Sequence, residues 1–204
     1  MTRAFIVSRP TDINLARACR ARMQELGWEA SIMVDQREWE AMPDDTISAK
    51  YSTLGRGMFG NACATGIADG ILENSKEGDV VMKMDCDIWI SHEASDWFSS
   101  PTKARATRIM YRKNIAWGGC WSATREHLQA ARITADTIGR CNCPESYLNL
   151  HALALTEPRL EYHGTLATQW EGGERGFVAT LPITRRRHRQ TEGLALFDTT
   201  FSLP

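Results

Sequence analysis

Two carboxylates separated by one residue are the clearest chemical signal in this chain. Asp85 and Asp87 interrupt the stretch "MKMDCDIWIS", residues 82–91, whose flanking parts have the apolar character of buried strands. Residues i and i+2 of an extended segment point the same way, so both carboxylates would face one ligand while Cys86 turns into the fold. At a separation of about 6.7 Å and an effective dielectric constant of about 20, the two charges would repel by about 2.5 kcal/mol.

A divalent cation would convert this repulsion into attraction. Carboxylate oxygens are ligands for Mg²⁺ and Mn²⁺, and such ions commonly complete their coordination with phosphate oxygens of a substrate. An isolated Asp-x-Asp match is by itself better explained as a solvated strand end. The interpretation of the motif therefore depends on the elements that surround it.

Strands and helices alternate through the first half of the chain. Apolar runs predict strands over 3–8, 29–35 and 79–85, helical spacing predicts helices over 11–27 and 61–78, and 36–57 reads as an irregular connection with short helical pieces. This alternation predicts an α/β protein with a mostly parallel sheet covered by helices on both faces. In such sheets ligands bind beyond the carboxyl ends of the strands, which is where the Asp-x-Asp lies.

The second half continues with less regular patterns. We expect helices over 95–100, 125–139 and 144–155, strand pieces over 106–113 and 116–124, and a late strand over 159–165. The tail from about Gly172 has little periodicity and contains "TRRRHRQ", residues 184–190. No repeat or low-complexity linker marks a boundary, so a single domain over 1–204 is expected.

Composition excludes several classes of protein. The chain has 204 residues, 43% of them hydrophobic, and a formal net charge of -1, which argues against a partner bound by global electrostatics. The apolar run before Arg9 is too short for a signal peptide or a membrane span, so we expect a cytoplasmic protein without a membrane partner. The six cysteines are scattered and are expected to be reduced, and Cys141 with Cys143 lacks the second pair of a structural zinc site.

Three segments, in order, resemble the GT-A class of nucleotide-sugar glycosyltransferases, including its large family-2-like group. They are "RGMFGNACATGIADGIL" followed directly by "GDVVMKMDCD", then "AWGGCWSATREHLQAAR", then "CNCPESYLNLHAL". The resemblance covers residues 1 to about 165. It implies a GT-A type, Rossmann-like sandwich in which 1–90 would bind the nucleotide-sugar, and 91–204 would form the acceptor half and the C-terminal tail.

The chain also departs from the pattern of that class. Ser146 stands where the helix-opening acid is usually followed by Asp, and no Gln-x-x-Arg-Trp type signature appears near the C-terminus. The chain is also short for the class. These departures argue against processive synthesis of a polysaccharide.

The resemblance implies a metal site and its ligands. Asp87 would bind Mn²⁺ or Mg²⁺ bridging the two phosphates of the donor, and Asp85 would lie near the ribose or the metal. A late histidine often supplies a third ligand in this class; His163 and His188 both qualify, and His163 is preferred. A lone histidine is also commonly structural.

Further residues are assigned to the donor and acceptor by the same resemblance. Arg9, Asp35 and Arg56 would contact the nucleotide of a donor expected to be a UDP-sugar, although each also fits a surface residue in an ion pair. The sugar and acceptor pocket would be shaped by Trp117, Gly118, Gly119 and Trp121, while several of the seven tryptophans must belong to the core.

Glu145 is the candidate general base, which would take a proton from the acceptor hydroxyl of a hexosyl- or pentosyltransferase and contribute a factor of about 10²–10⁴ in rate. Its position after Pro144 fits equally well a residue that favours the first turn of a helix. The stereochemistry of transfer stays open, and in a retaining enzyme Glu145 would bind the acceptor instead.

The acceptor is the least determined part of the prediction. Arg185, Arg186, Arg187 and His188 would contact a phosphate or a nucleic acid, or would only solvate a loop. Small stand-alone enzymes of the class glycosylate hydroxymethylated pyrimidines in viral DNA, which makes DNA a candidate acceptor. Two alternatives remain: a sugar-phosphate nucleotidyltransferase, although "VSRPTDIN" lacks the expected Gly-rich loop, and a non-catalytic nucleotide- or carbohydrate-binding module.

Overall fold

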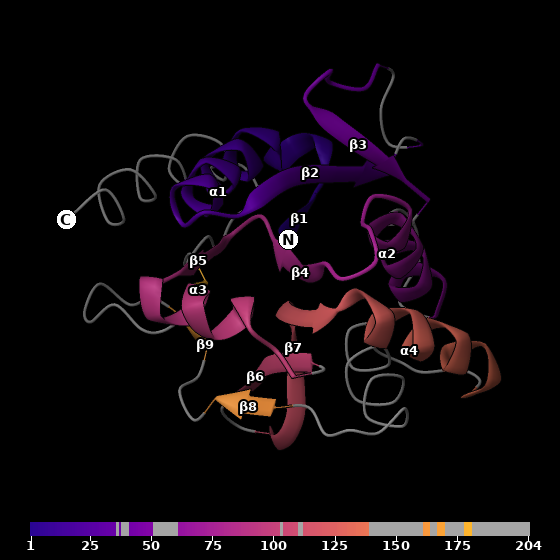
Figure 1. Cartoon of the computed structure of the whole chain (residues 1–204). Helices are drawn as coiled ribbons and strands as arrows, with labels where there is room; N and C mark the ends of the chain where they lie inside the picture. The colour runs from indigo at the N-terminus through magenta and orange to yellow at the C-terminus, as the bar shows by residue number, and fades with distance from the viewer. Residues whose placement is uncertain are drawn as a thin grey trace.

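The computed structural model describes residues 1–35, 37, 41–50, 61–102, 104–109 and 112–138, and the short strands at 161–163, 167–169 and 178–180. Within these residues the chain forms a central sheet with helices on both faces (Figure 1). The expected α/β architecture with a mostly parallel sheet flanked by helices is confirmed.

The central sheet has the strand order β3-β2-β1-β4-β7-β6-β8. The strands are β1 (Thr2–Ser8), β2 (Glu29–Asp35), β3 (Thr46–Ala49), β4 (Val80–Asp85), β6 (Ala104–Ile109), β7 (Arg112–Thr124) and β8 (Glu161–His163). Neighbouring strands pair in parallel except at β7, which is antiparallel to both β4 and β6. Among the described strands of this sheet, all but β7 therefore end at the same edge.

Alternating side chains in β1, β2 and β4 build two cores, one on each face of the sheet. On one face, α1 (Ile13–Glu25) and α3 (His92–Ser99) cover Ile6, Ile32 and Met84. The apolar stripe of α1 buries Leu15, Ala16, Cys19 and Met23 against these strands, close to the prediction from helical spacing. This face holds the larger of the two hydrophobic clusters.

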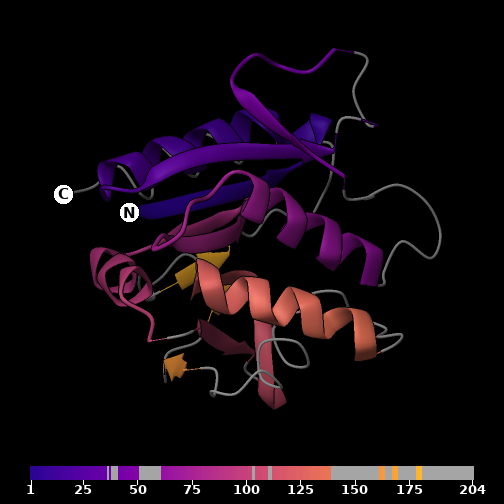
Figure 2. The ribbon, with the colours of Figure 1, turned by 45° about the vertical axis from the view of Figure 1, so that its right-hand side comes forward.

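The opposite face is covered by α2 (Asn61–Glu73) and α4 (Arg125–Ile138), which lie side by side in both views (Figures 1 and 2). Their buried residues pack on Phe5, Met33 and Trp121. A Cβ placed on Gly70 of α2 would lie 2.7 Å from the Ala49 Cβ, so the missing side chain allows α2 to approach β3 closely.

Several elements differ from the sequence prediction. The stretch 36–57 was expected to be irregular, yet it contains β3, whose hydrogen-bonding partner β2 is supplied from outside the segment. The two strand pieces after 104 form an antiparallel hairpin, β6 and β7. Helix α3 begins three residues earlier than expected because the Ser91 hydroxyl accepts a hydrogen bond from the Ala94 N–H and caps it. The helix expected over 144–155 lies outside the described residues.

A second, small sheet has the order β5-β10-β9, with β5 (Ile88–Ile90), β9 (Ala167–Gln169) and β10 (Val178–Thr180). The strand character of "IWI" was expected from sequence, whereas β9 and β10 lie in a region without clear periodicity. Because β5 follows β4 directly, the Asp-x-Asp connects the two sheets. In the described part of the chain, no helix is long and apolar enough to cross a membrane.

Candidate functional site

The carboxyl ends of β1, β2 and β4 bring three predicted site residues to one edge of the sheet. Val7 of β1 pairs with Asp85 of β4, and Ser8 pairs with Val34 of β2, so Arg9 and Asp35 follow at the same level. Asp85 and Asp35 lie on strands two positions apart, which corresponds to about 10 Å. The edge predicted from the strand and helix order therefore gathers Arg9, Asp35 and Asp85.

The Asp-x-Asp does not have the extended geometry expected from sequence. Asp85 is the last residue of β4, whereas Cys86 and Asp87 form a turn before β5. The alternation of a strand thus ends at Asp85, and the argument that both carboxylates share one strand face was wrong. The burial of Cys86, 6% exposed, was predicted correctly. Asp87 is half-buried in the turn.

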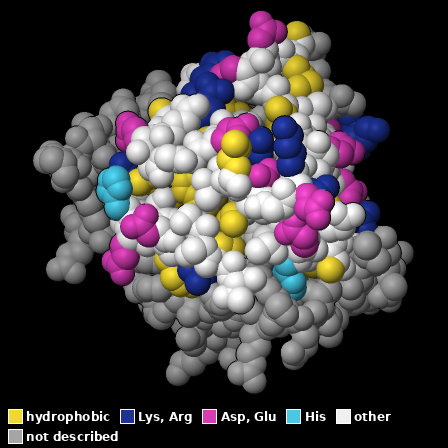
Figure 3. Space-filling view, in the orientation of Figure 1, with side chains coloured by type: hydrophobic (Ala, Val, Ile, Leu, Met, Phe, Trp, Pro, Cys, Tyr) yellow, Lys and Arg dark blue, Asp and Glu magenta, His cyan; other side chains and the backbone are white. Residues whose placement is uncertain are grey.

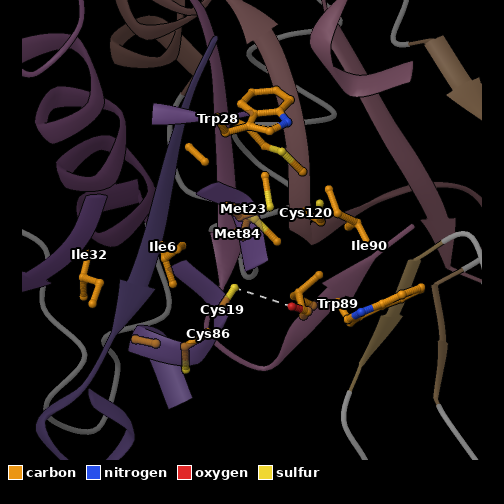
Figure 4. Close-up of a cluster of buried hydrophobic side chains, with 14 of the residues drawn as sticks. Ile6, Cys19, Met23, Trp28, Ile32, Met84, Cys86, Trp89, Ile90 and Cys120 are labelled. Carbon is orange, nitrogen blue, oxygen red and sulfur yellow. Dashed lines mark hydrogen bonds between the residues drawn. The ribbon is translucent and has the colours of Figure 1, made fainter. Parts of the chain in front are cut away.

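Two buried thiols near this edge, Cys86 and Cys19, have raised pKa values. Burial and then the negative charges of Asp87, Asp12 and Asp85 raise the pKa of Cys86 well above its usual value. Burial and then Asp87 and Asp85 also raise the pKa of Cys19, whose thiol donates to the Ile88 carbonyl oxygen at 3.5 Å (Figure 4). Burial is the first cause for both thiols, and the carboxylates of the edge add to it.

Asp12 is a site residue that sequence reasoning missed. Asp12 ends a 3-10 helix (Pro10–Asp12) between β1 and α1; its side chain makes no capping hydrogen bond to α1, and the residue is 3% exposed. A signal for it was present in the sequence, because the loop after the first strand of an α/β sheet lies at the ligand-binding edge.

Asp85 is paired with a cation from its own strand. Lys83 Nζ donates to Asp85 Oδ1 at 2.6 Å. The Lys83 side chain is 4% exposed and that of Asp85 is 44% exposed, so the cation is inside the protein and the carboxylate reaches solvent. The pattern of the sequence predicts no role for Lys83.

Asp35 is also held by a neighbouring cation. The Arg37 guanidinium donates to Asp35 at 2.9 Å and 2.6 Å, and the Arg37 backbone N–H donates at 3.1 Å. Asp35 is 1% exposed, while the Arg37 side chain is 55% exposed. Arg37 covers the carboxylate from outside, where a bound ligand would have to approach it.

The other predicted residues of the described chain lie on β7 and β8. Trp121 was expected to shape a pocket, but it is 2% exposed and belongs to the core under α2 and α4, so that assignment is corrected. Gly119 is buried in β7 and precedes Cys120, the register partner of Met84, so it lies at the level of Asp85 on the neighbouring strand. Trp117 and Gly118 belong to the same strand. His163 ends β8, three strand positions from β4, or about 14 Å. The strand order therefore does not bring His163 to Asp85.

The remaining predicted residues fall outside the described part of the chain. They are Arg56, Glu145, Arg185, Arg186, Arg187 and His188. On the face seen in Figure 3, the described acidic and basic side chains are interspersed, without one extended patch of a single sign.

The residues at this edge fit a divalent cation that is bound together with a ligand. Asp85 and Asp87 offer carboxylate oxygens, the donors that Mg²⁺ and Mn²⁺ prefer. The described residues contain no group of three or more His, Cys, Asp or Glu side chains arranged to hold a metal. Two carboxylates plus the oxygens of a diphosphate would suffice for such an ion, whereas the protein groups alone form no complete cage.

Comparison with solved structures finds similarity to two glycosyltransferases. One is a mutant of the Drosophila β-1,4-galactosyltransferase 7 in complex with manganese, UDP-Gal and xylobiose, with 15% identity, a TM-score of 0.41 and coverage of 64% of this chain and 51% of that chain. The other is the apo form of GlyE from Streptococcus pneumoniae TIGR4, with 12% identity, a TM-score of 0.48 and coverage of 99% and 63%. The chain thus spans between half and two thirds of the length of these structures.

No protein-family model matches the sequence, and the search among curated proteins found no significant match.

Proposed function

We propose that this chain is a metal-dependent glycosyltransferase of the GT-A type that uses a nucleoside-diphosphate sugar, with a UDP-sugar as the expected donor. The observation that supports this most directly is the sheet register: Asp85 ends β4, Asp87 follows in the turn, and the paired strand β1 brings Arg9 to the same edge. Like charges gathered at a ligand-binding edge are stabilised when a cation joins them.

The residues at this edge divide into groups with different roles. Asp87, in the turn, would hold the metal through its carboxylate, and Asp85 would accept a hydrogen bond from the nucleoside. Asp35 would accept one only if the nucleoside displaced the Arg37 guanidinium that covers it. Arg9 would contact the nucleotide from the end of β1. When bound, the metal neutralises charge that develops on the departing diphosphate.

The acceptor half of the proposal rests on the sequence. Glu145 would remove the proton of the acceptor hydroxyl, and residues 91–204 would form the acceptor site. Hydroxymethylated pyrimidine in DNA is the candidate acceptor, with Arg185, Arg186 and Arg187 as phosphate contacts. Duplex DNA binding at low salt, with a salt dependence reduced by replacing these arginines, would support that acceptor, and no binding would exclude it.

A thermal-shift screen tests the donor half directly. Nucleotide-sugars and nucleoside diphosphates are added to the full chain with and without Mn²⁺, because a ligand that binds only the folded state raises the melting temperature by mass action. We expect one nucleotide to stabilise the protein in a metal-dependent way, and Asp87→Ala to remove that shift. Stabilisation by a nucleotide-sugar without turnover would favour a non-catalytic binding module. Activity with a sugar phosphate and a nucleoside triphosphate would favour a nucleotidyltransferase.

A further inference from the structure

The burial of Lys83 sets it apart from an ordinary surface lysine. Its register partners on the two neighbouring strands are Phe5 and Trp121, each 2% exposed, so the aliphatic part of Lys83 lies in a row of buried aromatic residues. An ammonium group in such a position is costly unless it is paired. The pairing with Asp85, the last residue of β4, supplies the opposite charge.

This pairing changes what Asp85 can offer to a ligand. One carboxylate oxygen, Asp85 Oδ1, accepts a hydrogen bond from Lys83 Nζ at 2.6 Å, while the Asp85 side chain remains 44% exposed. A carboxylate has lone pairs for further hydrogen bonds, so Asp85 can still accept from a hydroxyl group. Its charge, however, is already compensated by a cation that is fixed inside the protein.

We propose that Lys83 is a positioning residue that reserves Asp85 for a hydroxyl of the nucleoside and leaves the metal to Asp87. The inference rests on the proposed function and extends it. With the Lys83 ammonium beside Asp85, the edge attracts a divalent cation less strongly than it would without that positive charge. The metal then binds well only when the diphosphate supplies further oxygens, so metal and nucleotide bind as a unit.

The decisive measurement is the affinity of the full chain for Mn²⁺ alone, determined by titration calorimetry or by the electron paramagnetic resonance signal of the free ion. Removing a fixed positive charge should raise this affinity, and we expect Lys83→Met to bind Mn²⁺ about tenfold more tightly than the wild type. A residue with only a structural role would give the opposite sign, because a disturbed edge binds metal less well. Unchanged or weaker binding by Lys83→Met overturns the inference.

Three further variants make the assignment specific. Lys83→Arg keeps the charge and should retain the wild-type affinity for Mn²⁺. The double variant Lys83→Met with Asp85→Asn should lose the gain, because the carboxylate that Lys83 compensates is then absent. Arg3→Met removes a partly buried cation from the ion pair with Asp79, and should destabilise the protein without changing the affinity for Mn²⁺.

A second measurement covers the case in which Lys83→Met does not fold. Asp85→Asn keeps an oxygen that can accept from Lys83 but loses the opposite charge, so we expect a less stable protein whose affinity for Mn²⁺ alone falls by about tenfold. Asp87→Asn removes a metal ligand as well as a charge and should lose at least about 100-fold. Equal losses in the two variants overturn the division of roles. If the wild type binds no Mn²⁺ even with each of the common nucleoside diphosphates present, the proposed function fails together with the inference.

Discussion

The two ends of β4 carry carboxylates in contrasting surroundings. Just before its amino end, Asp79 is 5% exposed and receives the Arg3 guanidinium at 2.7 Å, the Lys76 N–H at 2.8 Å and the Met1 ammonium at 3.3 Å. At its carboxyl end, Asp85 forms an ion pair with Lys83, and its side chain reaches solvent. One end of the strand is saturated with donors, and the other keeps acceptor capacity.

The saturated end is also tied to the rest of the fold. The Arg125 N–H, at the start of α4, donates to the Asp79 carbonyl oxygen at 2.9 Å, and the Gly78 N–H donates to Glu126 at 2.7 Å. Gly78 adopts φ +79°, a conformation that favours glycine. An aspartate whose oxygens are occupied by several donors, such as Asp79, stabilises the fold. An aspartate that keeps acceptor capacity and reaches solvent, such as Asp85, can bind a ligand.

The largest effect should come from the carboxyl end of β4 and the turn that follows it. Asp87→Ala should lower metal-dependent transfer or hydrolysis of the nucleotide-sugar by at least about 10³-fold, because a catalytic metal contributes several kcal/mol. The melting temperature without ligand should remain near that of the wild type. Retained turnover at saturating Mn²⁺ would contradict the assignment of Asp87 as the metal ligand.

The saturated end should show the reverse pattern. Asp79→Asn leaves the Arg3 cation without its buried partner, and we expect a loss of about 3 kcal/mol in the free energy of unfolding. For a chain of this length that corresponds to a fall of roughly 6–12 °C in melting temperature. The Mn²⁺ affinity should not change, and a variant that lost metal binding at wild-type stability would break the comparison.

The pH dependence of stability should also distinguish the two ends. Burial opposes ionisation of Asp79, but hydrogen bonds from Lys76, Arg3 and the N-terminus outweigh it and lower its pKa. A lowered pKa in the folded state gives stability that is present above the unfolded value of about 3.9 and is lost as the pH falls through the folded value. The difference in melting temperature between wild type and Asp79→Asn should therefore shrink from pH 5 to pH 3. A constant difference would contradict this.

The smallest effect is expected at Asp45, a carboxylate paired with an exposed arginine. Hydrogen bonds from Arg17, opposed by burial, and further contacts with Arg20 lower the pKa of Asp45 to about 2. Arg17 is 44% exposed in this pair, so solvent screens the interaction. Arg17→Ala should cost only about 0.5–1 kcal/mol by denaturant unfolding. A loss as large as that of Asp79→Asn would show that burial does not set the difference between them.

The parts of the fold that were predictable are those whose pattern is local. Strands β1, β2 and β4 are buried on both faces and appear as short apolar runs, and α4 carries its own helical period. Strand β3 lies in a polar segment that does not predict a strand. It forms because it pairs with β2, and this pairing cannot be predicted from the sequence of the segment alone. The antiparallel direction of β7 is likewise a property of pairing.

The same distinction applies to the site. The edge of the sheet that gathers Arg9, Asp35 and Asp85 followed from the order of strands and helices. The burial of Lys83 could not be predicted, because it depends on Phe5 and Trp121, which are distant in sequence and become its neighbours only when β1 and β7 pair with β4. The turn at Asp87 depends in the same way on β5 leaving the central sheet to pair with β10.

The buried thiols beneath the acidic edge bear on which metals the protein can select. Cys19 and Cys86 lie under the carboxylates, and soft ions such as Zn²⁺ and Cu⁺ favour sulfur ligands. Both thiols are buried, at 1% and 6% exposure, and burial is the first cause that raises the pKa of each. An ion that arrives at the edge therefore meets the oxygens of the half-buried Asp85 and Asp87 before it meets sulfur, and oxygen is the ligand that hard cations prefer.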